Sequence, residues 1–96
     1  MNKYEIIFIV KSTIESDAVN KTVSELTKTI TDNKSKVLET KELGQKQLAY
    51  PIKKEVTGYY FVLQVEANTV AINEFEHKAL INENVIRHMI IKLDEE

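Results

Sequence analysis

The chain has 96 residues, of which 43% are hydrophobic and 29% are charged. This composition is typical of a folded globular protein and excludes intrinsic disorder, so we expect a single domain over residues 1–96. The absence of cysteine excludes disulfides and cysteine zinc sites, and the net charge of −2 argues against coating nucleic acid by bulk charge. No apolar run is long enough to cross a bilayer and no secretory signal is visible, so we expect a cytoplasmic protein without membrane contact.

The first half of the chain predicts a strand, a helix and a second strand. Lys3–Val10 is apolar at both parities, which is typical of a central strand. A helix is expected from Ser16, a candidate N-cap, to about Asp32. Its apolar stripe consists of Val19, Val23, Leu26 and Ile30. The second strand is expected from Lys36 to about Ala49, with a bulge at Gly44.

The second half of the chain repeats this order. Gly58 opens a strand that continues to Ala67 and has alternating apolar side chains. Asn68 or Thr69 can cap a second helix that ends near Leu80, and Val85–Leu93 reads as the last strand. Proline lacks an amide donor, so Pro51 places the second strand at an edge of the sheet.

This order of elements predicts an α+β fold, the ferredoxin-like βαββαβ sandwich. Right-handed crossovers place both helices on one face of a four-stranded antiparallel sheet, with the first and third strands central. The other sheet face is then uncovered, and its many apolar groups suggest a surface that binds a protein partner. The residues expected there are Ile7, Ile9, Tyr60, Val62 and Met89, together with Arg87 and Ile91. Alternatively, strand twist and loops cover part of this face.

Few residues have the spacing that catalysis or metal binding requires. His77 lies between Glu76 and Lys78 on the polar side of its helix, which favours a solvated side chain over a metal ligand. His88 lies in an apolar strand and is either a half-buried residue or an RNA contact. No glycine-rich phosphate loop is present. The sequence therefore predicts no enzyme, no metal site and no cofactor.

Positive charge is concentrated in one segment of the chain. No acid occurs between Glu42 and Glu55. This segment contains Lys46, Tyr50, Lys53 and Lys54, and the last strand adds Arg87 and Lys92. Lysines beside an aromatic ring suit a phosphate backbone with a base or sugar nearby. The alternative interpretation is that a run without acids of this length arises by chance.

Several segments carry a family resemblance. They are Lys3-Tyr4-Glu5, the run from Gly44 to Lys54, Gly58-Tyr59-Tyr60 and the run from Asn84 to Met89. Together, in order and spacing, they resemble bacterial small-subunit ribosomal protein six, and the resemblance covers the whole chain. The Leu-Ala-Tyr-Pro-Ile run over residues 48–52 is the most specific of these segments.

The resemblance implies a structural component of the ribosome without catalytic activity. It implies binding to the central domain of 16S ribosomal RNA, in a heterodimer with small-subunit protein eighteen. The RNA-facing positions that it implies are Lys3, Tyr4, Lys46, Tyr50, Lys53, Lys54, Arg87 and, more weakly, Lys92. The chain departs from the family in two ways, because Arg87 is its sole arginine and its acidic tail is only Asp94-Glu95-Glu96.

A function of another class is a ferredoxin-like module that binds a small molecule, such as an acylphosphatase or a regulatory domain. An acylphosphatase needs an anion cradle with an arginine in the first strand-to-helix loop. The loop here, Lys11–Glu15, contains neither arginine nor glycine, so no small-molecule substrate is expected. A regulatory domain would self-associate and bind an effector in the dimer cleft.

Overall fold

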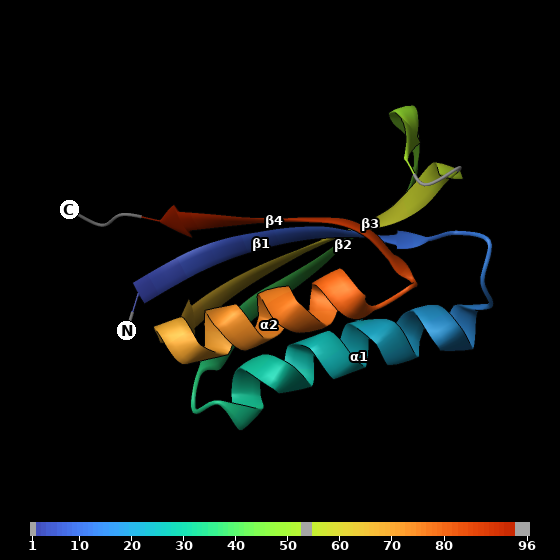
Figure 1. Cartoon of the computed structure of the whole chain (residues 1–96). Coiled ribbons are helices and arrows are strands. Elements are labelled where there is room, and N and C mark those ends of the chain that lie inside the picture. The colour runs from blue at the N-terminus through green and yellow to red at the C-terminus, as the bar shows by residue number, and fades with distance from the viewer. Residues whose placement is uncertain (1, 53–54, 94–96) are drawn as a thin grey trace.

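The architecture of the chain is a four-stranded sheet with two helices on one face. The computed structural model describes residues 2–52 and 55–93. Its elements are β1 (Asn2–Lys11), α1 (Ser16–Asp32), β2 (Lys36–Ile52), β3 (Glu55–Ala67), α2 (Thr69–Ile81) and β4 (Val85–Leu93) (Figure 1). The strand order is β2-β3-β1-β4, and every neighbouring pair is antiparallel. The predicted ferredoxin-like fold, with β1 and β3 central, is confirmed.

The main core lies between the sheet and the helical layer. Ile6, Phe8 and Val10 of β1 are fully buried beneath the helices, as period-two alternation predicts. The ring of Phe8 stacks on Phe61 of β3 at 5.3 Å and meets Phe75 of α2 edge-on at 6.0 Å between centroids. The predicted stripe of α1 also faces this core, with Val19, Leu26 and Ile30 buried and Val23 half-buried.

The helix starts follow different local rules. Asn68 caps α2, because its side-chain oxygen accepts a hydrogen bond from the backbone N–H of Ala71 at 2.8 Å. The prediction that Ser16 caps α1 is wrong, since Ser16 is already helical and the cap position is Glu15. Glu15 makes no side-chain cap bond, and Asp17 supplies the negative charge that favours the first turn. Within residues 2–52 and 55–93, neither helix combines the length and apolar composition that a membrane span requires.

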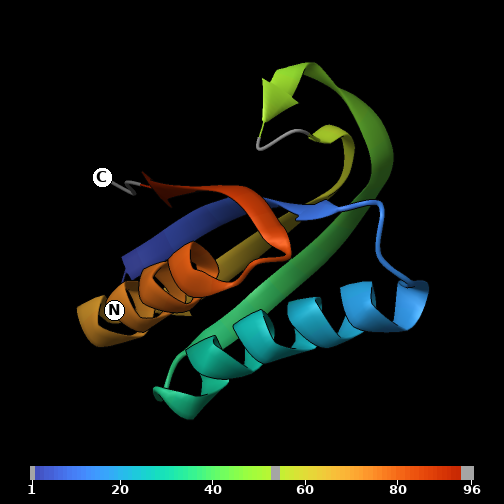
Figure 2. The ribbon, with the colours of Figure 1, turned by 45° about the vertical axis from the view of Figure 1, so that its right-hand side comes forward.

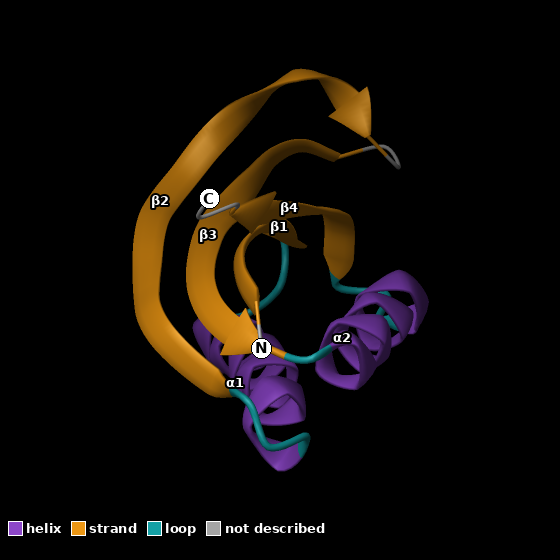
Figure 3. Cartoon of the chain, turned by 90° about the vertical axis from the view of Figure 1, so that its left-hand side faces the viewer, coloured by secondary structure: helices purple, strands orange, loops and turns teal. Residues whose placement is uncertain are grey.

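The strands β2 and β3 extend further than predicted and form a hairpin that leaves the sheet. β1 ends at Lys11, opposite Gly58 of β3, so the segments 47–52 and 55–57 beyond it have no third strand beside them. These segments, called the outer hairpin below, bend over the sheet face opposite the helices (Figures 2 and 3). The predicted bulge at Gly44 is present as a register shift with a φ of +85°, and it begins the bend.

The outer hairpin covers part of the sheet face that was expected to be open. Leu48 packs against Ile9 of β1 and Ile86 of β4, and we call these three buried residues the outer cluster. Ile9 is only 7% exposed and Val62 only 8% exposed, so the expectation that these two residues are surface groups is wrong. The alternative, in which twist and loops cover part of the face, is what the structure shows.

A bulge in β4 explains how Ile86 reaches the outer face. The β1–β4 register shifts between Ile9 and Val10, which pair with Arg87 and Val85 respectively. Ile86 is therefore the extra residue, and it packs in the outer cluster while Val85 packs in the main core. A simple alternation of faces does not predict two successive buried residues, and this is why the sequence pattern misplaced the boundary of the open face.

Gly58 permits the close approach of the outer hairpin to the sheet. A Cβ atom at this position would collide with Cγ2 of Ile9 and lie 3.3 Å from the carbonyl oxygen of Val10. Because one of these neighbours is backbone and the other belongs to the outer cluster, neither can move without cost.

We therefore expect Gly58→Ala to lower the free energy of unfolding by about 1–3 kcal/mol, the usual cost of overpacking. Chemical denaturation measures this change. Val56→Ala is the matched control, because Val56 lies on the same segment of β3 and is exposed. A Gly58→Ala protein as stable as the control would show that β3 does not approach Ile9 as closely as described.

Candidate nucleic-acid and protein interface

Cationic and aromatic side chains from both edges of the sheet meet on the outer face. Arg87 of β4 donates a hydrogen bond from Nη1 to the hydroxyl oxygen of Tyr50 at 3.0 Å. Lys46 of β2 places its Nζ 5.9 Å from the ring centroid of Tyr60 on β3. We call Lys46, Tyr50, Tyr60 and Arg87 the basic-aromatic cluster. Although β2 and β4 are the opposite edges of the sheet, the bent hairpin brings the end of β2 across β3 and β1 to β4 (Figure 3).

The register of the sheet positions this cluster. Ile9 of β1 lies opposite Tyr60 on β3 and opposite Arg87 on β4, so the three side chains form one row on the outer face. Gly44 continues the row on β2, and Lys46 follows two residues further along the same strand. Ile9 is buried in the outer cluster with Leu48 and Ile86, and Tyr60 packs against this cluster. The polar groups of the row therefore lie beside buried apolar side chains.

The cations of the cluster are available to an external anion. Lys46 and Arg87 are exposed, and Tyr50 is 58% exposed. Within the part of the chain that the structure describes, no carboxylate forms an ion pair with Lys46 or Arg87. Their contacts are with a tyrosine ring and a tyrosine hydroxyl, which orient the side chains without neutralising their charge.

An apolar strip lies beside the cluster on the same face. It consists of Ile7, Met89 and Ile91, which the register places on the outer side of β1 and β4. Met89 is 44% exposed and Ile91 is 39% exposed. Residues of the strip and of the cluster line one hollow of about 220 Å³, together with neighbours on β1 and β4: Ile7, Ile9, Tyr60, Arg87, His88 and Met89. An apolar strip of this kind suits a protein surface better than a phosphate backbone.

The remaining predicted RNA-facing residues lie elsewhere. Lys3 is on the outer face, but six residues from Ile9 along β1, which corresponds to about 20 Å. Tyr4 and Lys92 are directly paired near the same end of the sheet and share the helix-facing parity. Tyr4 is half-buried against the main core, whereas Lys92 is exposed. Lys53 and Lys54 lie outside the described residues.

The two histidines behave as ordinary structural residues. His77 is exposed on α2. The side chain of His88 is 18% exposed, and its Nε2 lies 4.0 Å from a carboxylate oxygen of Glu76 on α2. His88 is therefore half-buried, the first of its two predicted interpretations. Among residues 2–52 and 55–93, no three His, Asp or Glu side chains are grouped in a way that could hold a metal ion.

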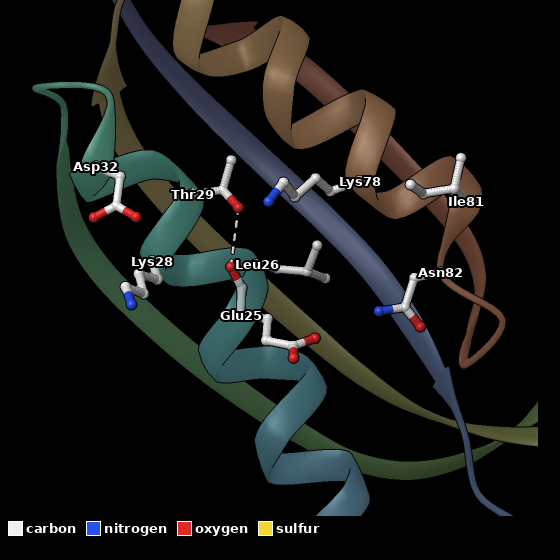
Figure 4. A pocket seen from close by; sticks show the side chains of 8 residues that line it. All are labelled: Glu25, Leu26, Lys28, Thr29, Asp32, Lys78, Ile81 and Asn82. Carbon is white, nitrogen blue, oxygen red and sulfur yellow. Dashed lines mark hydrogen bonds between the residues drawn. The ribbon is translucent and has the colours of Figure 1, made fainter.

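A larger hollow of about 540 Å³ lies between α1 and α2 (Figure 4). Glu25, Lys28, Asp32 and Lys78 give its walls mixed charge, while Leu26 and Ile81 are apolar. Its buried hydroxyl, that of Thr29, donates to the carbonyl oxygen of Glu25 at 3.0 Å and is not available to a ligand. In this hollow Glu25 and Asp32 stand among the lysines, whereas the cations of the basic-aromatic cluster have no paired carboxylate among the described residues.

Sequence reasoning took Leu48 as an apolar anchor of the second strand and Ile9 as a partner-facing residue, and did not predict that they are buried together with Ile86. Ile86 received no role, and Tyr60 was assigned only to the protein-partner surface. The sequence signal for Ile86 was the pair Val85-Ile86 at the start of a strand. Successive strand residues point to opposite faces of the sheet, so two apolar residues in a row indicate either a bulge or a strand that is buried on both faces.

Comparison with known proteins identifies a family pattern over nearly the whole chain. The model of the family described as "Ribosomal protein S6" matches residues 3–92. The chain is similar to the solved structure of 30S ribosomal protein S6 from Thermotoga maritima, with a TM-score of 0.90 and 24% identity over 96% of this chain and 87% of that chain. It is also similar to an uncharacterised protein of Thermotoga maritima, with a TM-score of 0.64 and 17% identity over 97% of this chain and 98% of that chain. At identities of 24% and 17%, the two structures support the fold alone. The family match over residues 3–92 supports family membership.

Proposed function

The chain belongs to the ribosomal protein S6 family and is a constituent of the small ribosomal subunit, and from this premise we propose that it binds the central domain of 16S ribosomal RNA together with small-subunit protein eighteen. In this proposal its role is structural and not catalytic, and it acts in the cytoplasm as part of the ribosome. The small-molecule module considered from the sequence has no comparable support, because the family match extends over residues 3–92.

The observation that carries the RNA part of the proposal is the basic-aromatic cluster. Arg87 and Lys46 are exposed, carry no paired carboxylate among the described residues and stand beside two tyrosines. Guanidinium and ammonium groups bind phosphate oxygens, and tyrosine contributes a hydroxyl donor and a ring for an unpaired base. Lys3 is proposed as a further RNA contact on the outer face, about 20 Å away, and Tyr4 and Lys92 as contacts near the same end of the sheet but with the helix-facing parity. The family resemblance also assigns Lys53 and Lys54 to RNA.

The apolar strip supports the protein part of the proposal. Ile7, Met89 and Ile91 present aliphatic surface on the edge strand β4 and its neighbour β1. Covering such surface stabilises a complex by about 25 cal/mol per Å². Ile9 and Val62 are already buried within the chain, so the proposed partner surface now rests on Ile7, Tyr60 and Met89, with Ile91 added.

The low charge of the chain makes the two binding events interdependent. A net charge of −2 supplies no long-range attraction to RNA, so affinity depends on local contacts. A bound partner protein that carries its own cations would extend the RNA surface beyond the basic-aromatic cluster. We therefore expect the heterodimer to bind RNA more tightly than this chain does alone.

The RNA contact is tested by removing the two cations of the cluster. For the double variant Lys46→Ala and Arg87→Ala, we expect the slope of log K against log salt to fall by about 1.4–1.8, because two fewer phosphate contacts release fewer counterions. The measurement is a titration of a labelled central-domain RNA fragment with the heterodimer at several salt concentrations.

The matched control is the double variant Lys28→Ala and Lys78→Ala. It removes the same charge from exposed positions on the helical layer (Figure 4). We expect its salt slope to equal that of the wild type. An equal decrease of the salt slope in both double variants would mean that net charge alone causes the effect. An unchanged slope in the Lys46→Ala and Arg87→Ala variant would mean that the cluster does not contact RNA.

The protein contact is tested by placing a carboxylate in the apolar strip. Met89→Asp should weaken binding of small-subunit protein eighteen by at least about tenfold, or about 1.4 kcal/mol, because the partner would desolvate an unpaired charge. Calorimetric titration measures the affinity, and circular dichroism checks the fold. Val70→Asp is the control, since Val70 is exposed near the start of α2, where a negative charge is favourable. Wild-type affinity in a folded Met89→Asp protein would place the partner on another surface.

A further inference from the structure

The outer hairpin lacks the support that the rest of the sheet has. Regular β2–β3 pairing ends at Gln47 opposite Thr57, and the next pair is Ile52 opposite Glu55 after a register shift. An isolated two-stranded hairpin is marginally stable in water, so contacts outside the ladder must hold this one in place. One such contact is polar: the hydroxyls of Ser12 and Thr57 are hydrogen-bonded at 2.6 Å at the base of the hairpin.

Leu48 is the apolar contact. It is 7% exposed, whereas Lys46, Gln47 and Tyr50 around it on β2 are exposed. Its side chain meets Ile9 and Ile86, which belong to β1 and β4. Leu48 thereby attaches the end of β2 to two strands that are not neighbours of β2 in the sheet.

The attachment point coincides with the basic-aromatic cluster. Leu48 lies two residues after Lys46 and two residues before Tyr50, and Ile86 immediately precedes Arg87. The hydrogen bond between Arg87 and Tyr50 therefore spans the sheet directly beside the contact of Leu48 with Ile86. If Leu48 released Ile86, Lys46 and Tyr50 would move away from Arg87 together, since they are carried by the same strand.

We propose that Leu48 is a positioning residue for RNA recognition: by packing in the outer cluster with Ile9 and Ile86 it holds the cations of β2 and β4 in one fixed arrangement on the outer face. This inference rests on the proposed RNA-binding function and specifies how that surface is assembled. Leu48 itself touches no RNA. Its contribution to affinity is preorganisation, because a free hairpin would have to be ordered at the moment of binding.

A double-mutant cycle separates positioning from general stability. The proteins are wild type, Leu48→Ala, Lys46→Ala and the double variant, each assayed as the heterodimer against central-domain RNA. Leu48→Ala should weaken binding about tenfold. Lys46→Ala should weaken binding less in the Leu48→Ala background than in the wild type, since the lysine is already displaced. Additive losses would overturn the proposal.

Two further variants calibrate the cycle. Leu48→Met keeps an apolar side chain of similar volume and should restore most of the affinity. Leu43→Ala truncates a leucine on the same strand that is 44% exposed, and should leave binding unchanged. If Leu48→Ala does not fold, Ile86→Val replaces it as the milder truncation of the same contact. A Leu43→Ala loss equal to that of Leu48→Ala would contradict a specific role for the outer cluster.

The docking of the hairpin is also measured without RNA. In the isolated protein we expect nuclear Overhauser contacts from the methyl groups of Leu48 to those of Ile9 and Ile86, and their loss in Leu48→Ala with the main-core contacts of Phe8 retained. Absence of these contacts in the wild type would overturn the proposal whatever the RNA result. Wild-type docking without any RNA binding would instead contradict the proposed function.

Discussion

The packing of Leu48 with Ile9 and Ile86 covers one part of the outer face of the sheet and determines which residues that face presents. In the strand order β2-β3-β1-β4, the first and last strands are not neighbours. The bulge at Gly44 bends β2, Gly58 lets β3 approach Ile9, and the bulge at Ile86 supplies the opposing side chain. Each of these local irregularities costs some ladder regularity, and together they bring two edges of the sheet within hydrogen-bond distance at Tyr50 and Arg87.

The helix-facing half of the fold follows from periodicity, and the outer half does not. Ile6, Phe8 and Val10 were assignable to one face because strand alternation and the stripe of α1 agree, and the pairing of β1 with β3 has no register shift. Ile86 and Leu48 were not assignable in the same way, because a one-residue bulge exchanges the two faces and a bend in a hairpin leaves no local pattern in the sequence.

The candidate site was likewise predictable from the sequence only in part. The charge run and the family resemblance pointed to Lys46, Tyr50 and Arg87 by residue type, and these three residues do come together. Their meeting beside the outer cluster depends on a contact between Tyr50 and Arg87, which are 37 positions apart in the sequence. Such a contact is a property of the folded chain and not of any segment. Lys3 and Lys92 show the converse, since they have the same chemistry but lie at the other end of the sheet.

The bent hairpin also gives the molecule two regions of unequal local stability. The central strands are covered by two helices and share the main core. The outer hairpin is instead held by the small outer cluster, the hydroxyl pair of Ser12 and Thr57 at its base and the hydrogen bond from Arg87 to Tyr50. Segments with few buried contacts open without global unfolding and form separate cooperative units. We therefore expect the amide hydrogens of Gln47 and Leu48 to exchange with solvent through a local opening, and those of Ile6 and Leu63 to exchange only when the whole domain unfolds. The surface that presents the cations is thus also the part of the chain that can release and re-form independently of the core.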